Sequence, residues 1–133
     1  MSVSDDSVIL FEEGVIGVPR ARRFELLQHS GSALRVLKCL DIEGFNLPVV
    51  DPSKVDPGYR PKLAERVTQI LDATSDQLLL LAVTALGPDG ATANLKAPVV
   101  VNVARRTAVQ VILDGEYALR APVDLAGLKN DLT

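Results

Sequence analysis

The sequence predicts a mainly β protein, folded as a small antiparallel β-barrel-like single domain with one or two short helices. Runs of apolar, often β-branched residues recur about eight times and are separated by glycine, proline and aspartate turn signals. Only one stretch, in the middle of the chain, has apolar residues at helical spacing. The 133 residues, 47% of them hydrophobic, suffice for the core of one domain. Together these features favour a barrel or sandwich over a doubly wound α/β fold.

The first four strands are expected in the N-terminal half of the chain. Alternation within residues 33–40 would place Arg35 and Lys38 on the solvent side. Pro48 favours an edge position for the fourth strand, because proline has no N–H to give to a ladder. The prolines of residues 51–61 then predict an extended loop. The four strands are predicted at residues 8–11, 24–28, 33–40 and 45–50.

The middle of the chain holds the one clear helix, followed by two long strands. Apolar residues recur at helical spacing over residues 62–73, with polar side chains opposite them. The run at residues 77–86 is too apolar to alternate, as expected for a central strand buried on both faces. Residues 92–103 predict one or two further strands, and Pro98 predicts a bend or bulge within them.

The chain is expected to end in one more strand and a weak helix. Alternation within residues 108–113 places Gln110 and Ile112 on the face opposite three apolar residues. Residues 119–133 are weakly helical, and we expect residues 123–133 to fray. Neither a repeat nor a linker divides the sequence, so one domain is expected to span all 133 residues.

Charge and composition argue against several classes of protein. The 14 basic and 17 acidic residues give a net charge of −3, and the only basic cluster is at residues 20–23, so nucleic-acid binding is not expected. The single Cys39 excludes an intramolecular disulfide and a cysteine-built zinc site. The longest apolar run, residues 78–83, is too short to span a membrane, and the N-terminus lacks a signal-peptide pattern. We therefore expect a cytoplasmic protein without a membrane partner.

Few side chains suggest catalysis. His29, the single histidine, has no evident nucleophile or orienting acid, and is interpreted as a surface or capping residue. Cys39 lies in an apolar run and is interpreted as a core residue. Acidic pairs beside turn residues, such as Asp114 and Glu116, are interpreted as turn caps rather than metal or glycosidase sites. The GVIG of residues 14–17 lacks the basic residues of an RNA-binding loop. We expect no enzyme, cofactor or metal site.

A long motif in the second half of the chain carries a family resemblance. Residues 92–102 read TANLKAPVVVN, and QVILD at residues 110–114 and then Tyr117 follow. This resembles the flagellar assembly factor FliW family, whose C-terminal half has TANLxAPxxxN and a downstream QVxL with a tyrosine. Looser matches in the N-terminal half bring the resemblance to nearly the whole chain. They are FEEGVIG at residues 11–17, FELL at 24–27 and VDP at 50–52.

What this resemblance implies is a non-enzymatic regulator with a small β-barrel-like fold. FliW-like proteins bind the translational repressor CsrA, relieve its repression of flagellin messenger RNA, and also bind flagellin. CsrA and flagellin are therefore the expected partners, and the motif supplies candidate contact residues. The same residues also have a structural interpretation, as turn, bend and core positions. The candidates are Asn94, Lys96, Pro98, Asn102, Glu116 and Tyr117.

Departures from the family pattern leave a second function open. The family's aromatic residues are replaced by LRVL at residues 34–37, and Lys62 and Arg66 stand where the family tends to be acidic. The alternative is a diverged flagellin chaperone or scaffold without CsrA antagonism. For CsrA itself, the four acids of residues 1–13 and the eight of residues 41–90 suggest an electrostatic hypothesis. An acidic protein docked near CsrA would repel RNA without occupying the RNA site.

Overall fold

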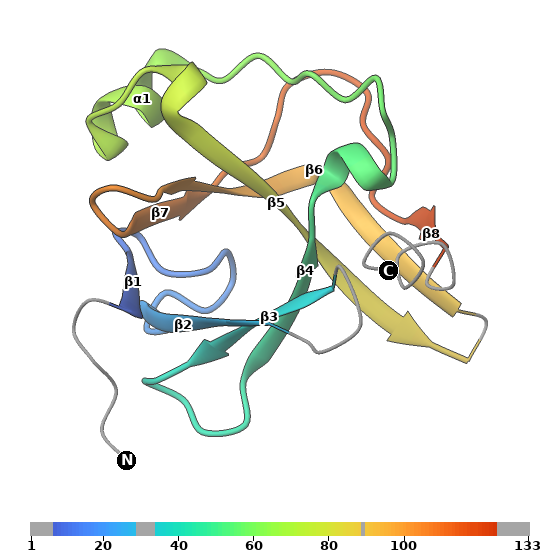
Figure 1. The fold of residues 1–133 in the computed structure, drawn as a ribbon, viewed down its shortest axis with the longest axis horizontal. Helices are drawn as coiled ribbons and strands as arrows, with labels where there is room; N and C mark the ends of the chain where they lie inside the picture. The colour runs from blue at the N-terminus through green and yellow to red at the C-terminus, as the bar shows by residue number, and fades with distance from the viewer. Residues whose placement is uncertain (1–6, 29–33, 89, 125–133) are drawn as a thin grey trace.

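A closed barrel forms the centre of the molecule (Figure 1). The computed structural model describes residues 7–28, 34–88 and 90–124. Seven of the eight strands in this described part pair in the order β5-β4-β3-β2-β1-β7-β6, and a β5–β6 pairing closes the ring. Strand β8 lies outside the ring and pairs with the first part of β6. The strands are β1 (Val8–Phe11), β2 (Arg23–Gln28), β3 (Arg35–Cys39), β4 (Asn46–Val50), β5 (Leu78–Gly87), β6 (Gly90–Asn102), β7 (Thr107–Gln110) and β8 (Ala121–Val123).

The mainly β fold with a small barrel confirms the prediction, with one pairing of a different kind. Strands β1 and β7 run parallel, because strand direction alternates at the other six junctions of a seven-strand ring and the remaining junction must join two strands of the same direction. All the other strand pairings are antiparallel.

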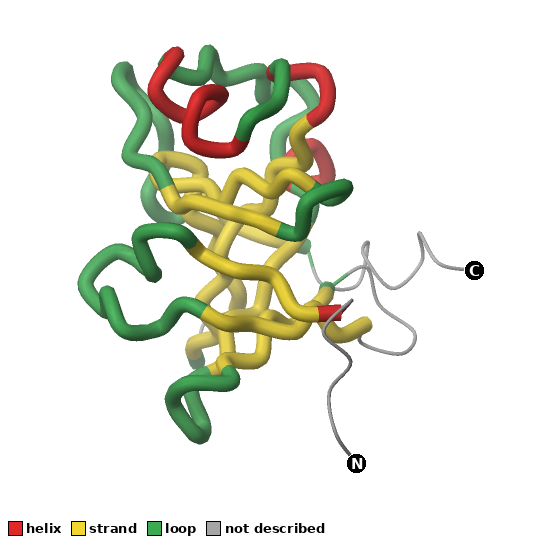
Figure 2. Tube along the Cα trace, turned by 90° about the vertical axis from the view of Figure 1, so that its left-hand side faces the viewer, coloured by secondary structure: helices red, strands yellow, loops and turns green. Residues whose placement is uncertain are grey.

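The helix predicted at residues 62–73 is confirmed but shorter, as α1 (Glu65–Leu71). Ala64 has extended backbone before it, and Asp72 ends it in the left-handed region with φ 51°. Two 3-10 turns, Pro52–Lys54 and Ser75–Gln77, complete this end of the barrel. Figure 2 shows most of the helical residues, in red, towards one end of the strands, whereas a short red segment lies just before β1.

Two apolar clusters stabilise the fold, one inside the barrel and one outside it. The inner cluster takes residues from all seven ring strands, with Phe11 and Phe24 fully buried and their rings 4.6 Å apart. The outer cluster joins α1 to the outer face of β6 and β7, with Val100 and Val109 among its members. Strand β6 supplies both clusters, because alternate residues of a strand point to opposite faces. Its second half is therefore buried on both sides.

This burial pattern corrects the expectation for residues 77–86, which was a strand buried on both faces. Only part of β5 is buried, because its end continues past the barrel as a hairpin with β6 and leaves Leu86 61% exposed. Pro48 does not mark an edge strand either, since β4 pairs with both β3 and β5. The β5 pairing begins only at Val49, so Pro48 lies outside it.

The C-terminal expectation is corrected where the structure describes it. Residues 121–123 form β8 rather than part of a weak helix, because they pair with residues 91–93 of β6. The fraying expected at residues 123–133 falls almost wholly outside the described residues, as does His29.

The loop after β1 turns sharply, and one glycine makes this turn possible. Gly14 has φ +72°, and a Cβ atom there would collide with the backbone of Pro19. Gly17 in the same loop has φ +84° but has open space around the corresponding position. Both glycines therefore avoid a conformational penalty, and only Gly14 also avoids a collision.

We predict that Gly14→Ala destabilises the protein by more than about 2 kcal/mol, because backbone strain and a backbone collision add. Gly17→Ala is the matched control, since it introduces the strain alone. Urea unfolding measures both, from the change in midpoint at constant slope. Equal losses in the two variants would contradict the importance of the contact with Pro19.

A carboxylate fixes the other end of this loop. Asp41 accepts hydrogen bonds from the backbone N–H groups of Arg22 (3.0 Å) and Arg23 (2.7 Å), and pairs with the Arg23 guanidinium at 2.8 Å. The Arg23 N–H, together with the lesser contributions of its side chain and of Arg22, holds the pKa of Asp41 below the ordinary 3.8, although burial opposes this. The ionised carboxylate is thus favoured in the folded state.

A lowered folded-state pKa gives stability that is present above the unfolded value and lost as the pH falls. We therefore expect Asp41→Asn to lower the free energy of unfolding at pH 7. The difference from wild type should shrink once the pH falls below 3.8 and Asp41 becomes protonated. Urea unfolding across this pH range checks the prediction, and a difference that stays constant with pH would contradict it.

Candidate functional site: a β6 bulge and the groove beside it

The TANLKAP motif forms a bulge in β6. Leu81 pairs with Val99 but Val83 pairs with Asn94, so the residues between them on β6 are looped out relative to β5. The Asn94 Oδ1 atom accepts hydrogen bonds from the backbone N–H groups of Lys96 (2.9 Å) and Ala97 (3.0 Å). The irregularity predicted at Pro98 is therefore confirmed as a bulge, and Asn94 has a structural role inside it.

The carbonyl groups of the bulge hold the segment that follows β7. Each of the four accepts a hydrogen bond from a group distant in the sequence, so the bulge fixes the path of residues 110–113 and of the loop before α1. These bonds are Tyr59 Oη to the Leu95 carbonyl (2.8 Å), the Leu113 N–H to Lys96 (2.8 Å), Gln110 Nε2 to Ala97 (3.1 Å), and the Val111 N–H to Pro98 (3.1 Å).

Tyr59 is a permanent donor in this network. Burial, with a smaller contribution from Tyr117, raises its pKa to about 12, so its hydroxyl stays protonated at neutral pH. The Tyr117 ring meets the Tyr59 ring edge-on, with centroids 5.7 Å apart. Tyr117 thus packs against the anchor of the bulge.

Asn102, at the end of the motif, fixes the helix. Its Nδ2 donates to the Leu71 carbonyl at 2.7 Å, and its Oδ1 accepts from the Arg105 N–H at 3.2 Å. The Arg105 guanidinium pairs with Asp72 at 2.8 Å, just beyond the helix. Asn102 is 5% exposed and Leu71 is 1% exposed, so this bond is buried. It gives a hydrogen-bond donor to a carbonyl at the end of the helix that would otherwise be buried without a partner.

The other candidate residues lie around the turn that follows residues 110–114. The Lys96 Nζ atom donates to the Gly115 carbonyl at 2.5 Å, which brings Lys96 beside Glu116. Glu116 is exposed, whereas Asn102 is the last residue of β6 and bonds to the end of α1. The structure therefore brings Lys96, Glu116 and Tyr117 together and leaves Asn102 apart. Contact of any of them with a partner stays a prediction.

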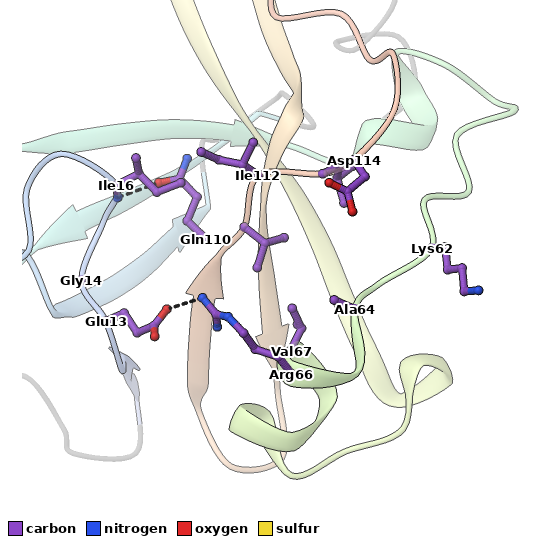
Figure 3. A pocket seen from close by; sticks show the side chains of 12 residues that line it. Glu13, Gly14, Ile16, Lys62, Ala64, Arg66, Val67, Gln110, Ile112 and Asp114 are labelled. Atoms are coloured by element: carbon purple, nitrogen blue, oxygen red, sulfur yellow. Dashed lines mark hydrogen bonds and ion pairs between the residues drawn. The ribbon is translucent and has the colours of Figure 1, made fainter.

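A groove of about 440 Å³ lies next to the bulge (Figure 3). The loop after β1 forms one wall, the start of α1 forms the other, and residues 110–114 run between them. An ion pair of 3.1 Å between Glu13 and Arg66 spans one end. The Ile16 N–H donates to Gln110 Oε1 at 3.0 Å and fixes the loop wall.

This groove was not predicted from the sequence, although some of its residues had unusual features there. Alternation places Ile112 on the face opposite three apolar residues, and it is 65% exposed beside Ile16, which is 46% exposed. The unusual basic residues Lys62 and Arg66 both line the groove. Nothing local in the sequence indicated that Glu13 would meet Arg66, since 53 residues separate them.

No group of three or more His, Cys, Asp or Glu side chains in the described ranges is placed to hold a metal ion. Cys39 is buried in the barrel, as predicted. Within the same ranges, no helix has the length and apolar character needed to cross a membrane.

These features define the class of the protein as a small β-barrel domain, with one α-helix outside the barrel in the described part of the chain. The family model described as FliW protein matches residues 1–123. The chain therefore belongs to the FliW family.

Similar proteins agree with this assignment. The flagellar assembly factor FliW of Thermotoga petrophila is 32% identical over 126 residues, covering 90% of this chain and 85% of that protein. The FliW of Shouchella clausii is also 32% identical, covering 92% of this chain and 87% of its own length. A crystal structure of the flagellar assembly factor FliW superposes with a TM-score of 0.83 at 25% identity, covering 94% of this chain and 89% of that one. The family is one of flagellar assembly factors.

We predict that Asn94→Ala destabilises the protein by about 1–3 kcal/mol, because two N–H groups of the bulge lose their acceptor. Asn94→Asp is the matched control, since an aspartate keeps the accepting oxygen that Asn94 uses. Urea unfolding at neutral pH compares the two variants. An alanine variant as stable as the aspartate variant would contradict the role of this side chain.

Proposed function

We propose that this chain is a non-enzymatic, cytoplasmic regulator of flagellum assembly that binds CsrA and flagellin. The observation that carries the proposal is the FliW family match over residues 1–123. Binding of CsrA would relieve repression of flagellin messenger RNA, and binding of flagellin would report the level of free flagellin. The protein then acts through contacts with other proteins and changes no covalent bond.

The surface of the groove supports a binding role. Ile16 and Ile112 are large, exposed aliphatic residues that lie next to each other at the groove (Figure 3), and such residues contribute to protein contacts when they are grouped. The charges of Glu13 and Arg66 neutralise each other. Together, the exposed aliphatic side chains and the neutralised charges resemble a surface for contact with another protein.

The distribution of charge weakens the electrostatic version of CsrA antagonism. Glu13, Asp41 and Asp72 belong to the acid-rich segments, and each is paired with an arginine. Their fields are therefore partly cancelled at the distance of a bound RNA. We favour antagonism that depends on direct contact with CsrA, with repulsion of RNA as a smaller contribution.

The alternative is a flagellin chaperone or scaffold that does not bind CsrA. The loss of aromatic residues at residues 34–37 motivates it. Leu37 is fully buried within the barrel, so a change there alters packing rather than the surface. Arg35 and Val36 are partly exposed and would alter a contact surface directly. The two functions therefore differ in whether a surface that includes β3 contacts CsrA.

We expect the purified protein to bind both purified CsrA and purified flagellin of the same bacterium in isothermal titration calorimetry. Added salt should weaken the effect on RNA binding by CsrA only slightly, because the antagonism depends mainly on direct contact. The matched measurement is RNA binding by CsrA at the same salt without this protein.

Binding of flagellin without CsrA would favour the chaperone alternative. If neither protein binds, the proposed function is wrong. A steep loss of antagonism with salt while the CsrA complex persists would restore the electrostatic version.

A further inference from the structure

Residues 110–113 continue β7 along the bulge, but only one of their edges is bonded. The N–H groups of Val111 and Leu113 both point toward β6, where they donate to the Pro98 and Lys96 carbonyls. In an extended chain the backbone groups of successive residues alternate in direction. The N–H and C=O of Ile112 therefore point away from β6, and neither is bonded to another described residue.

The edge of residues 110–113 is open because β1 does not continue alongside them. Strand β1 pairs with β7 at Leu10 and Phe11, and the last bond of this edge joins the Glu12 N–H to the Ala108 carbonyl at 3.1 Å. The chain then turns away at Gly14. The groove thus occupies the position that β1 would fill if it continued. Unpaired strand edges of this kind accept an added strand.

The shape of the groove determines which kind of chain segment could pair with the open edge. Its walls, the Glu13–Ile16 loop and the start of α1, rise on either side of the edge (Figure 3). A second copy of this chain has the same edge recessed between the same walls, so two such edges would not meet. A single extended segment can enter, and at about 3.3 Å per residue four residues would span the edge.

The charges at the groove indicate the chemistry of that segment. The Asp114 carboxylate points into the open space, whereas the Lys62 side chain points away from it (Figure 3). Neither has an ion pair among the described residues, while Glu13 and Arg66 already neutralise each other. Ile16 and Ile112 offer aliphatic surface. A complementary segment is extended, has an aliphatic side chain and carries a basic residue at the Asp114 end.

We propose that an extended segment of CsrA with a basic residue adds as a strand to residues 110–114 in this groove. This inference rests on the proposed function for the identity of the partner. CsrA fits better than flagellin because it must hold RNA phosphates on a basic surface, which complements the unpaired carboxylate. The backbone bonds would supply alignment, and the side chains would supply selectivity.

Ile112→Pro tests the added strand most sharply. It removes an N–H that is unbonded in the free protein, and edge strands accept proline where the N–H faces solvent. We expect CsrA binding to weaken about tenfold or more, because the pyrrolidine ring also blocks close approach. Ile112→Val is the matched control, since it keeps the N–H and the aliphatic surface, and should bind within about twofold of wild type.

Asp114→Lys provides a second test that does not depend on backbone tolerance. This exposed side chain can change without loss of folding, and reversal of its charge should weaken CsrA binding about three- to tenfold at low salt. Glu43→Lys, on the exposed β3–β4 loop, makes the same change in net charge and should have little effect. Calorimetry with purified CsrA and purified flagellin measures all four variants.

The outcomes separate the two proposals. If Ile112→Pro and Asp114→Lys lose CsrA binding but keep flagellin binding, the result supports the groove as the CsrA binding site. If the wild-type protein binds CsrA and neither variant weakens this binding, the proposed binding of CsrA in the groove is wrong. The proposed function then still holds. If the two variants lose flagellin rather than CsrA, the assigned occupant is wrong. If the wild-type protein binds neither partner, the proposed function fails and this inference fails with it.

Discussion

The rest of the structure depends on the hydrogen bonds that one amide side chain makes within β6. The Asn94 Oδ1 atom accepts from two successive N–H groups and so holds a bulge in β6, a strand that supplies residues to both apolar clusters. Without the bulge, β6 would keep one register with β5 along its whole length. The displaced carbonyls would then not reach Tyr59 and residues 110–113. A local exception to regular pairing thus determines how the outer layer is attached to the barrel.

The bulge also explains why an open strand edge and a groove form on this side of the molecule. Residues 110–113 bond to the displaced carbonyls on one edge, and β1 has already turned away from the other edge at Gly14. The same segment is therefore held firmly by the fold and left open to a partner. Contact residues placed on such a support lose little conformational entropy on binding, which favours affinity.

Much of the fold could be predicted from the sequence, because its signals are local. Turn residues and apolar runs located the ring strands, and helical spacing located α1. The difference in burial between β5 and β6 could not be predicted, because both strands are apolar. Burial depends on which part of each strand lies between the barrel interior and the outer cluster, and this is set by the tertiary fold. The motif residues were identified, but Asn94 and Asn102 have structural roles that depend on distant carbonyl groups. The groove depends on contacts between segments far apart in the sequence, such as Glu13 with Arg66.

We propose the open edge at Ile112 as the place where a partner strand pairs. Amide hydrogen exchange of this protein, free and bound to CsrA, tests it most directly. The N–H groups of Val111 and Leu113 are bonded already, so their exchange should be slow in both states. We predict that the Ile112 N–H exchanges rapidly in the free protein and becomes protected in the complex. An Ile112 N–H that stays unprotected while another surface becomes protected would contradict it.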